Sequence, residues 1–202
     1  MVIVDKADKV KQLIQNGKSK GFVLYDEIDD LLPPGFEAAD DFEDILAELA
    51  KYSIGVREEP EQDPDNASDD GVKLLDELGL QNHGDDAGDL EVIRIYLDEV
   101  GSTPRLTREE EVALAKRINP RGPESEAAMR QLIEANLRAV VRTAKHYVRG
   151  GFRLLDLLQE GNIGLMKAVE RFDPVRGYRF SPYAVWWVRR AMMQTLSQSQ
   201  QD

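Results

Sequence analysis

Apolar side chains recur every three or four residues over most of the chain, which is the spacing that gives an α-helix one buried face. The pattern starts with Val10 and Leu13, and Gly17 is expected to end this first helix. A second, short helix is expected over residues 25–32, because Pro33 cannot extend it.

A third helix is expected to complete this first domain. Asp40 or Asp41 can cap it, since a carboxylate at this position accepts hydrogen bonds from the first free backbone N–H groups. Its buried stripe consists of Phe42, Ile45, Leu46 and Leu49. We therefore predict a compact three-helix domain over residues 1–57.

Residues 58–89 break the helical pattern and are rich in acidic residues, proline, glycine and asparagine. One short apolar island interrupts them, at Leu74, Leu75, Leu78 and Leu80. A segment of this composition cannot bury enough apolar surface to offset its conformational entropy. We predict an acidic, flexible linker here.

Residues 90–202 return to helical spacing and predict a helical bundle. Thr107 and Glu110 form a capping box at the start of one of its helices. Ser181 as a cap, with Pro182 at the first helical position, is expected to start the last helix. The predicted fold class is all-α: a small three-helix domain, an acidic linker and a helical bundle.

Charge separates the two halves of the chain. Up to residue 89 there are 8 basic and 24 acidic side chains, a net charge of −16, and after it there are 18 and 14, a net charge of +4. No run of apolar residues approaches the ~18 to 20 needed to cross a bilayer, and there is no secretion signal. We expect a cytoplasmic protein that makes no membrane contact.

The residues that usually carry catalysis or metal binding are scarce. The chain has no cysteine and only two histidines, His83 in the acidic segment and His146 on a basic helix. Its many carboxylates lack the spacing of a calcium loop, and a solvated acidic tether explains them better. We predict no enzyme activity, no catalytic residue, no metal site and no cofactor.

A basic stripe leads into an aromatic cluster in the last third of the chain. Arg138, Arg142, Lys145 and Arg149 share one helical face, and residues 136–202 hold 11 basic against 5 acidic side chains. Aromatic and basic residues then alternate at Tyr178, Arg179, Phe180, Tyr183, Trp186, Trp187 and Arg190. Aromatic rings stack on unpaired bases while arginines meet phosphates, so this pattern favours binding of single-stranded nucleic acid.

A buried core stripe is the alternative explanation of these aromatic residues. The geometry of a helix argues against this alternative. Trp186 and Trp187 point ~100° apart, so a bundle this small has difficulty burying both side chains. The helix before them is also unusual, because it keeps Gly161 and Gly164 beside a polar face. Glycine destabilises a helix interior, and we interpret the pair as a place where another helix approaches closely.

The segment from residue 155 to residue 191, LDLLQEGNIGLMKAVERFDPVRGYRFSPYAVWWVRRA, closely resembles the core-binding and promoter-melting segments of bacterial RNA polymerase sigma factors. Residues 134–151 resemble the helix that precedes those segments, and residues 89–118 the segment at the start of the sigma core. Residues 13–33, LIQNGKSKGFVLYDEIDDLLP, are similar to the extra N-terminal domain of primary members.

The resemblance implies a non-catalytic initiation factor with two partners. The first is core RNA polymerase, whose largest subunit offers a coiled coil to Asp156, Gln159, Glu160, Asn162 and Met166. The second is promoter DNA, chiefly the single-stranded non-template minus-ten element. The aromatic group would melt and capture this element, with Asn136 in the second base pocket. The acidic N-terminal domain would occupy the polymerase DNA channel until DNA displaces it.

Several positions depart from the family pattern where DNA is read: Asp98, Ala139, Pro182, Arg190 and Met193. The chain also ends at Asp202, before the segments that in the family read the minus-thirty-five element. Two other interpretations therefore stay open. One is a truncated sigma-like protein that binds polymerase as an antagonist or decoy, and the other is a structural helical module whose aromatic stripe is core.

Overall fold

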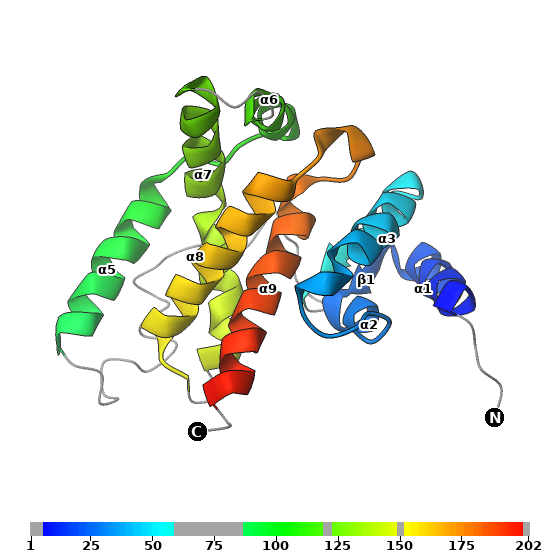
Figure 1. Cartoon of the computed structure of the whole chain (residues 1–202), viewed down its shortest axis with the longest axis horizontal. Coiled ribbons are helices and arrows are strands. Elements are labelled where there is room, and N and C mark those ends of the chain that lie inside the picture. Colours follow the sequence, from blue (N-terminus) through cyan, green and yellow to red (C-terminus); the bar gives the residue numbers. More distant parts are fainter. Residues whose placement is uncertain (1–5, 59–86, 119–122, 149–151, 200–202) are drawn as a thin grey trace. The chain divides into compact units, whose positions relative to one another are not determined.

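The computed structural model describes residues 6–58, 87–118, 123–148 and 152–199. Helices dominate these ranges (Figure 1), so the predicted all-α class is confirmed. The chain divides into two compact units, one formed by residues 1–67 with 175–183 and the other by 68–174 with 184–202. Most of the predicted linker lies outside the described residues, although its last three residues already belong to a helix that begins at Ala87.

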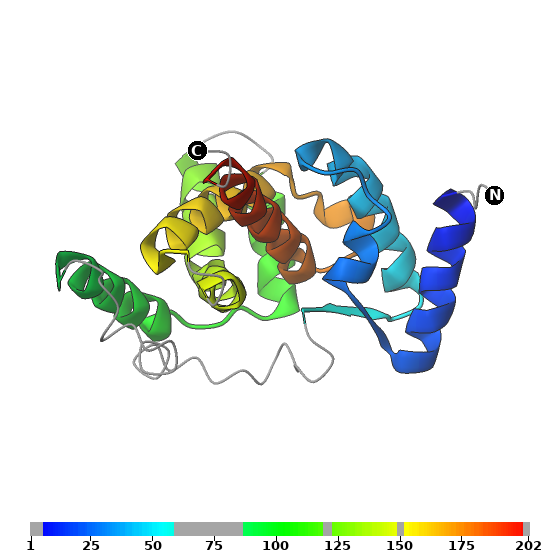
Figure 2. The same ribbon diagram turned by 90° about the horizontal axis from the view of Figure 1, so that it is seen from below.

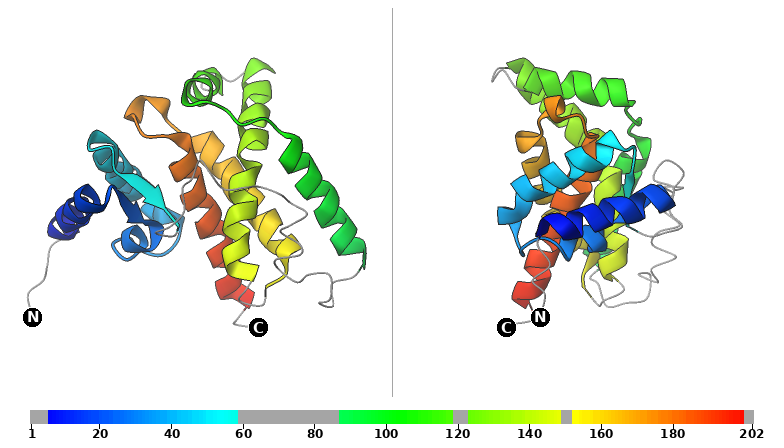
Figure 3. Two further views of the ribbon diagram at one scale, coloured as in Figure 1. Left: turned by 180° about the vertical axis from the view of Figure 1, so that it is seen from behind. Right: turned by 90° about the vertical axis from the view of Figure 1, so that its right-hand side faces the viewer.

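The first unit contains three α-helices and a two-stranded parallel sheet. In chain order its elements are α1 (Lys6–Lys20), β1 (Phe22–Leu24), α2 (Tyr25–Asp29), the 3-10 turn η1 (Phe36–Ala38), α3 (Ala39–Lys51) and β2 (Gly55–Arg57). Phe22 pairs with Gly55 and Leu24 with Arg57, and β2 is visible as the cyan arrow in Figure 3. The core of this unit includes Val23, Ile28, Phe42 and Leu49. The three predicted helices are present, whereas the sheet was not predicted.

Three sequence-based boundaries in this unit are wrong. The second helix, predicted over residues 25–32, ends at Asp29, before Pro33 could stop it. Gly17 does not end the first helix, which continues to Lys20. Gly17 is buried, and a Cβ at this position would lie 2.8 Å from a methyl carbon of Ile54 and 2.9 Å from one of Val23, so the absence of a side chain permits this close packing. Asp40 and Asp41 do not cap α3 but lie in its first turn. Their negative charges still stabilise the helix there, because the N-terminal end of the helix dipole is positive.

The second unit is built on helices α5 (Ala87–Ser102), α6 (Arg108–Ile118), α7 (Pro123–Val148), α8 (Leu154–Arg171) and the greater part of α9 (Phe180–Ser199). A short 3-10 turn, η2 (Pro174–Arg176), precedes α9. Helix α8 lies beside α9, and α5 lies at the outer edge of the unit, next to α8 (Figures 1 and 2).

The predicted capping box of α6 is confirmed, since Glu110 N–H donates to Thr107 Oγ1 at 3.2 Å and Thr107 N–H donates to Glu110 Oε2 at 2.7 Å. The predicted start of α9 is wrong, because the helix begins at Phe180 and includes Ser181 and Pro182. Proline is tolerated in a first turn because the backbone N–H it lacks would have no helical partner there.

Gly161 and Gly164 let α8 approach α9 closely. A Cβ on Gly164 would lie 2.6 Å from the backbone oxygen of Trp187 and 2.9 Å from Cβ of Ala191. A Cβ on Gly161 would lie 2.4 Å from Cε of Met192 and 2.6 Å from a methyl carbon of Val140. The close approach expected from the glycines therefore occurs within the chain, on the opposite side of α8 from its exposed residues.

We predict that Gly164→Ala lowers the free energy of unfolding by ~1–3 kcal/mol. The added methyl group would meet the backbone of α9, which cannot move away without separating the two helices. Gly88→Ala is the matched control, since a Cβ there meets nothing within 4 Å. Urea unfolding followed by circular dichroism compares the two variants. Equal stability of the two variants would contradict the packing described here.

Candidate functional site

One face of α8 is exposed and carries most of the residues predicted to bind a partner. Asp156, Gln159 and Met166 are exposed, whereas Glu160 and Asn162 are half-buried. Sequence analysis missed Ile163, which is 41% exposed on the same face, while Met166 is 45% exposed. The sequence could have indicated this position, because Ile163 lies three residues before Met166 and so shares its helical face. We call these six residues the α8 face.

Asn162 differs from the rest of the α8 face because its side chain is engaged within the chain. The hydroxyl of Tyr96, on α5, donates a hydrogen bond to Asn162 Oδ1 at 3.0 Å. Burial raises the pKa of Tyr96 to about 12. Arg153, just before α8, also forms an ion pair with Asp89 of α5. Two polar contacts thus join α5 to the segment that carries the α8 face.

The part of the aromatic cluster that belongs to the first unit surrounds a carboxylate. Tyr178, Phe180 and Tyr183 are buried, and the rings of Tyr178 and Tyr183 lie 5.6 Å apart between centroids. The hydroxyl of Tyr183 donates to Glu43 Oε1 at 3.0 Å. Burial is the main cause that raises the pKa of Tyr178 above its ordinary value. Arg179 is exposed.

Glu43, on α3, was missed by sequence analysis although it is buried. Its Oε2 lies 3.0 Å from an Nη1 atom of Arg176, which also lies 3.5 Å from a carboxylate oxygen of Asp44. In the same unit the hydroxyl of Tyr25 donates to the backbone oxygen of Pro182 at 3.1 Å. The sequence offered one indication of this role, because Glu43 directly follows Phe42 at the edge of the predicted apolar stripe. Residues 175–183 are therefore tied to the N-terminal domain by polar contacts as well as by burial.

The expectation that a bundle this small would have difficulty burying both tryptophans is wrong. Trp186 and Trp187 are 0% and 1% exposed, and their rings meet edge to face with centroids 5.5 Å apart. Every residue from Tyr183 to Met192 is buried, so this part of α9 is enclosed all round and can hide adjacent side chains that point ~100° apart. The guanidinium of Arg190 lies 5.2 Å from the Trp186 ring centroid, and that of Arg171 lies 5.3 Å from the centroid of Trp187.

The two candidate residues on α7 make hydrogen bonds within the chain. Asn136 is buried, and its Nδ2 donates to the backbone oxygen of Leu132 at 2.8 Å. Arg138 is half-buried and donates to backbone oxygens at the end of α5. Among the positions that depart from the family pattern, Ala139 is buried and Met193 is exposed.

Three family profiles match successive parts of the sequence. Their descriptions are Sigma-70 factor, region 1.1 at residues 5–78, Sigma-70 factor, region 1.2 at residues 91–119, and Sigma-70 region 2 at residues 132–201. The chain belongs to the sigma-70 family. In this family's terms, the elements from α1 to β2 lie in region 1.1, α6 and all but the first four residues of α5 lie in region 1.2, and region 2 runs from within α7 through α9.

Named relatives within the sigma-70 family are proteins called RNA polymerase sigma factor SigA. The one from Listeria monocytogenes is 39% identical over 200 residues, which is 94% of this chain and 51% of that protein. The one from Clostridium acetobutylicum is 39% identical over 199 residues, covering 96% of this chain and 48% of that protein. The chain thus spans about half the length of the curated relatives it matches.

Two properties of the described residues bear on partners and cofactors. None of their helices combines the length and apolar character that a membrane span requires. In the same ranges, no three His, Asp or Glu side chains gather in a way that could hold a metal ion.

The raised pKa of Tyr96 predicts a pH dependence of stability. Because the pKa is about 10 in an unfolded chain and about 12 here, the neutral phenol stabilises the fold below pH 10, and this contribution is lost as the pH rises through 12. Between pH 9.5 and 12, wild type should lose up to roughly 2–3 kcal/mol more unfolding free energy than Tyr96→Phe. Tyr52→Phe, which removes an exposed hydroxyl, should follow the wild-type profile in urea unfolding.

Proposed function

We propose that this chain is the part of a primary-type sigma factor that binds core RNA polymerase and captures the single-stranded non-template strand of the minus-ten promoter element. The match of regions 1.1, 1.2 and 2 in order along one chain carries this proposal. Its role is non-catalytic: it selects and holds DNA for an enzyme that does the chemistry.

The α8 face is the proposed contact with polymerase. Its opposite side is fixed against α9 by the two glycines, so the exposed side chains stand on a rigid support. Ile163 and Met166 provide apolar area, while Asp156 and Glu160 provide negative charge beside it. This combination suits a partner helix with apolar and basic residues, in agreement with the coiled coil of the largest subunit that the family resemblance implies.

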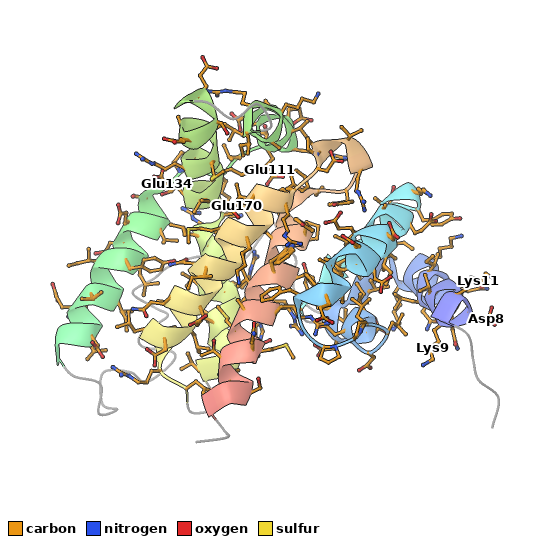
Figure 4. The ribbon with its side chains drawn as sticks, in the orientation of Figure 1. Asp8, Lys9, Lys11, Glu111, Glu134 and Glu170 are labelled. Atoms are coloured by element: carbon orange, nitrogen blue, oxygen red, sulfur yellow. The ribbon has the colours of Figure 1, made fainter. Side chains whose placement is uncertain are left out.

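We predict that Glu160→Lys weakens binding to core polymerase at least tenfold, because it reverses the charge within the α8 face. Glu134→Lys makes the same change on an exposed part of α7 (Figure 4) and should bind like wild type. Titration of labelled chain with core polymerase measures both affinities. If the two folded variants bind equally well, the α8 face is not the docking surface.

The DNA-capturing role is assigned to the aromatic cluster together with Arg179 and Arg190. Because Tyr183, Trp186 and Trp187 are buried, base stacking on them requires a rearrangement of their surroundings. Residues 175–183 offer a place for it to begin, since two hydrogen bonds and an ion pair, which charge and hydration can weaken, help to hold them to Glu43 and Tyr25. We propose that the acidic N-terminal domain holds this segment until polymerase and promoter DNA release it. Such self-masking agrees with the net charge of −16 up to residue 89, which repels nucleic acid.

We predict that Glu43→Gln increases the affinity of the free chain for a single-stranded minus-ten oligonucleotide two- to tenfold. The substitution keeps the side-chain size but removes the charge that pairs with Arg176. Glu48→Gln, on the same helix, is the control. Fluorescence anisotropy at low salt measures the change, and an unaltered affinity in Glu43→Gln would rule out this carboxylate as the holding contact.

The antagonist interpretation makes a different prediction for oligonucleotide binding by the complex of the chain with core polymerase. A decoy would bind core polymerase through the α8 face, yet its complex with core would show no preference for the non-template minus-ten strand over a scrambled strand. A preference of the complex for the minus-ten strand supports the initiation factor.

A further inference from the structure

Arg138 lies where α7 passes the end of α5. Its Nε donates to the backbone oxygen of Val100 at 3.2 Å, and its Nη2 donates to the oxygens of Gly101 and Thr103 at 2.7 and 3.0 Å. Helix α5 ends at Ser102, so these oxygens belong to the last turn and to the residue after it. Helix ends leave such carbonyls short of helical partners, although the oxygen of Val100 also accepts from the backbone N–H of Thr103 at 3.4 Å. Arg138 therefore donates to three carbonyls at the end of one helix.

The chemistry of this contact differs from that of a phosphate contact. The carboxyl end of a helix carries a partial negative charge, which favours a cation placed there. A guanidinium presents its donors in a fixed planar fork, whereas a lysine ammonium is a point charge on a flexible stem. Arg138 reaches its three acceptors from two separate nitrogens, Nε and Nη2, an arrangement that the single nitrogen of lysine does not reproduce, although lysine can replace arginine at many phosphates.

Helix α5 is also held by α8, through the hydrogen bond from Tyr96 to Asn162. Ile93, Leu97 and Val100 form the buried apolar side of α5. The helix thus bridges α7, by way of Arg138, and α8, by way of Tyr96. Loss of either contact should loosen the bridge without exposing the main core.

We propose that Arg138 is a positioning residue that fastens the end of α5 to α7, and that it supports nucleic-acid binding only by holding this bridge in place. Its position in the basic stripe of α7 had indicated a phosphate contact. The functional part of this inference rests on the proposed DNA binding, whereas the fastening itself is a property of the free chain.

The test compares Arg138→Lys with Arg138→Gln in the full chain. Amide hydrogen exchange of the free chain should become at least ~10-fold faster at residues 100–103 in both variants, because neither side chain can donate from two nitrogens placed as Nε and Nη2 of Arg138 are. Arg94→Gln, which removes an exposed charge from the middle of α5, should leave exchange at these residues unchanged. Protection equal to wild type in Arg138→Lys would overturn the proposal.

A second measurement separates positioning from phosphate contact. Binding of the minus-ten oligonucleotide to the complex with core polymerase is measured from low to high salt for both variants. A lost phosphate contact lowers the salt slope by about one, as expected for the exposed Arg179→Gln control. Our proposal expects weaker binding by both Arg138 variants with the wild-type slope. A reduced slope in Arg138→Gln, restored in Arg138→Lys, would identify a phosphate contact and overturn it. If wild type binds no oligonucleotide, the proposed function fails, and hydrogen exchange still decides the role of Arg138.

Discussion

The close contact between α8 and α9 is the constraint on which the second unit depends. Two missing side chains, at Gly161 and Gly164, allow the backbone of one helix to lie against the other. Each glycine destabilises the helix that contains it by about 0.5–1 kcal/mol relative to alanine. The close packing of α8 against α9 offsets this destabilisation. The same contact fixes which side of α8 faces outward, so the orientation of the α8 face follows from the glycines.

Much of this architecture could be predicted from the sequence because it is local. The capping box of Thr107 and Glu110 needs only four residues, and the apolar stripe of α3 needs only one helix. The parallel pairing of β1 with β2 could not be predicted in the same way. Each strand has three residues, and they lie about thirty residues apart, so neither offers a pattern long enough to indicate a strand.

The candidate site was harder to predict, since burial is decided by the whole molecule. Composition and spacing placed Asp156, Gln159 and Met166 on one helical face, and the structure exposes all three. They did not show that Trp186 and Trp187 would be buried, because burial depends on residues distant in the sequence, such as Gly164, whose position lies against the backbone of Trp187. The contacts of Glu43 and Arg138 within the chain were not predicted for a related reason. Their partners lie 140 and 35–38 residues away, beyond the reach of any local pattern.

The hydrogen bond between Glu43 and Tyr183 also has a consequence for synthesis of the chain. Its two partners are 140 residues apart, and ribosomes add about 5–20 residues each second. Glu43 therefore emerges roughly 7–28 s before the tyrosine that covers it. During that interval the N-terminal domain must fold with a carboxylate in its apolar stripe still open to water. The contact is then a late step in maturation, completed only when the start of α9 has left the ribosome.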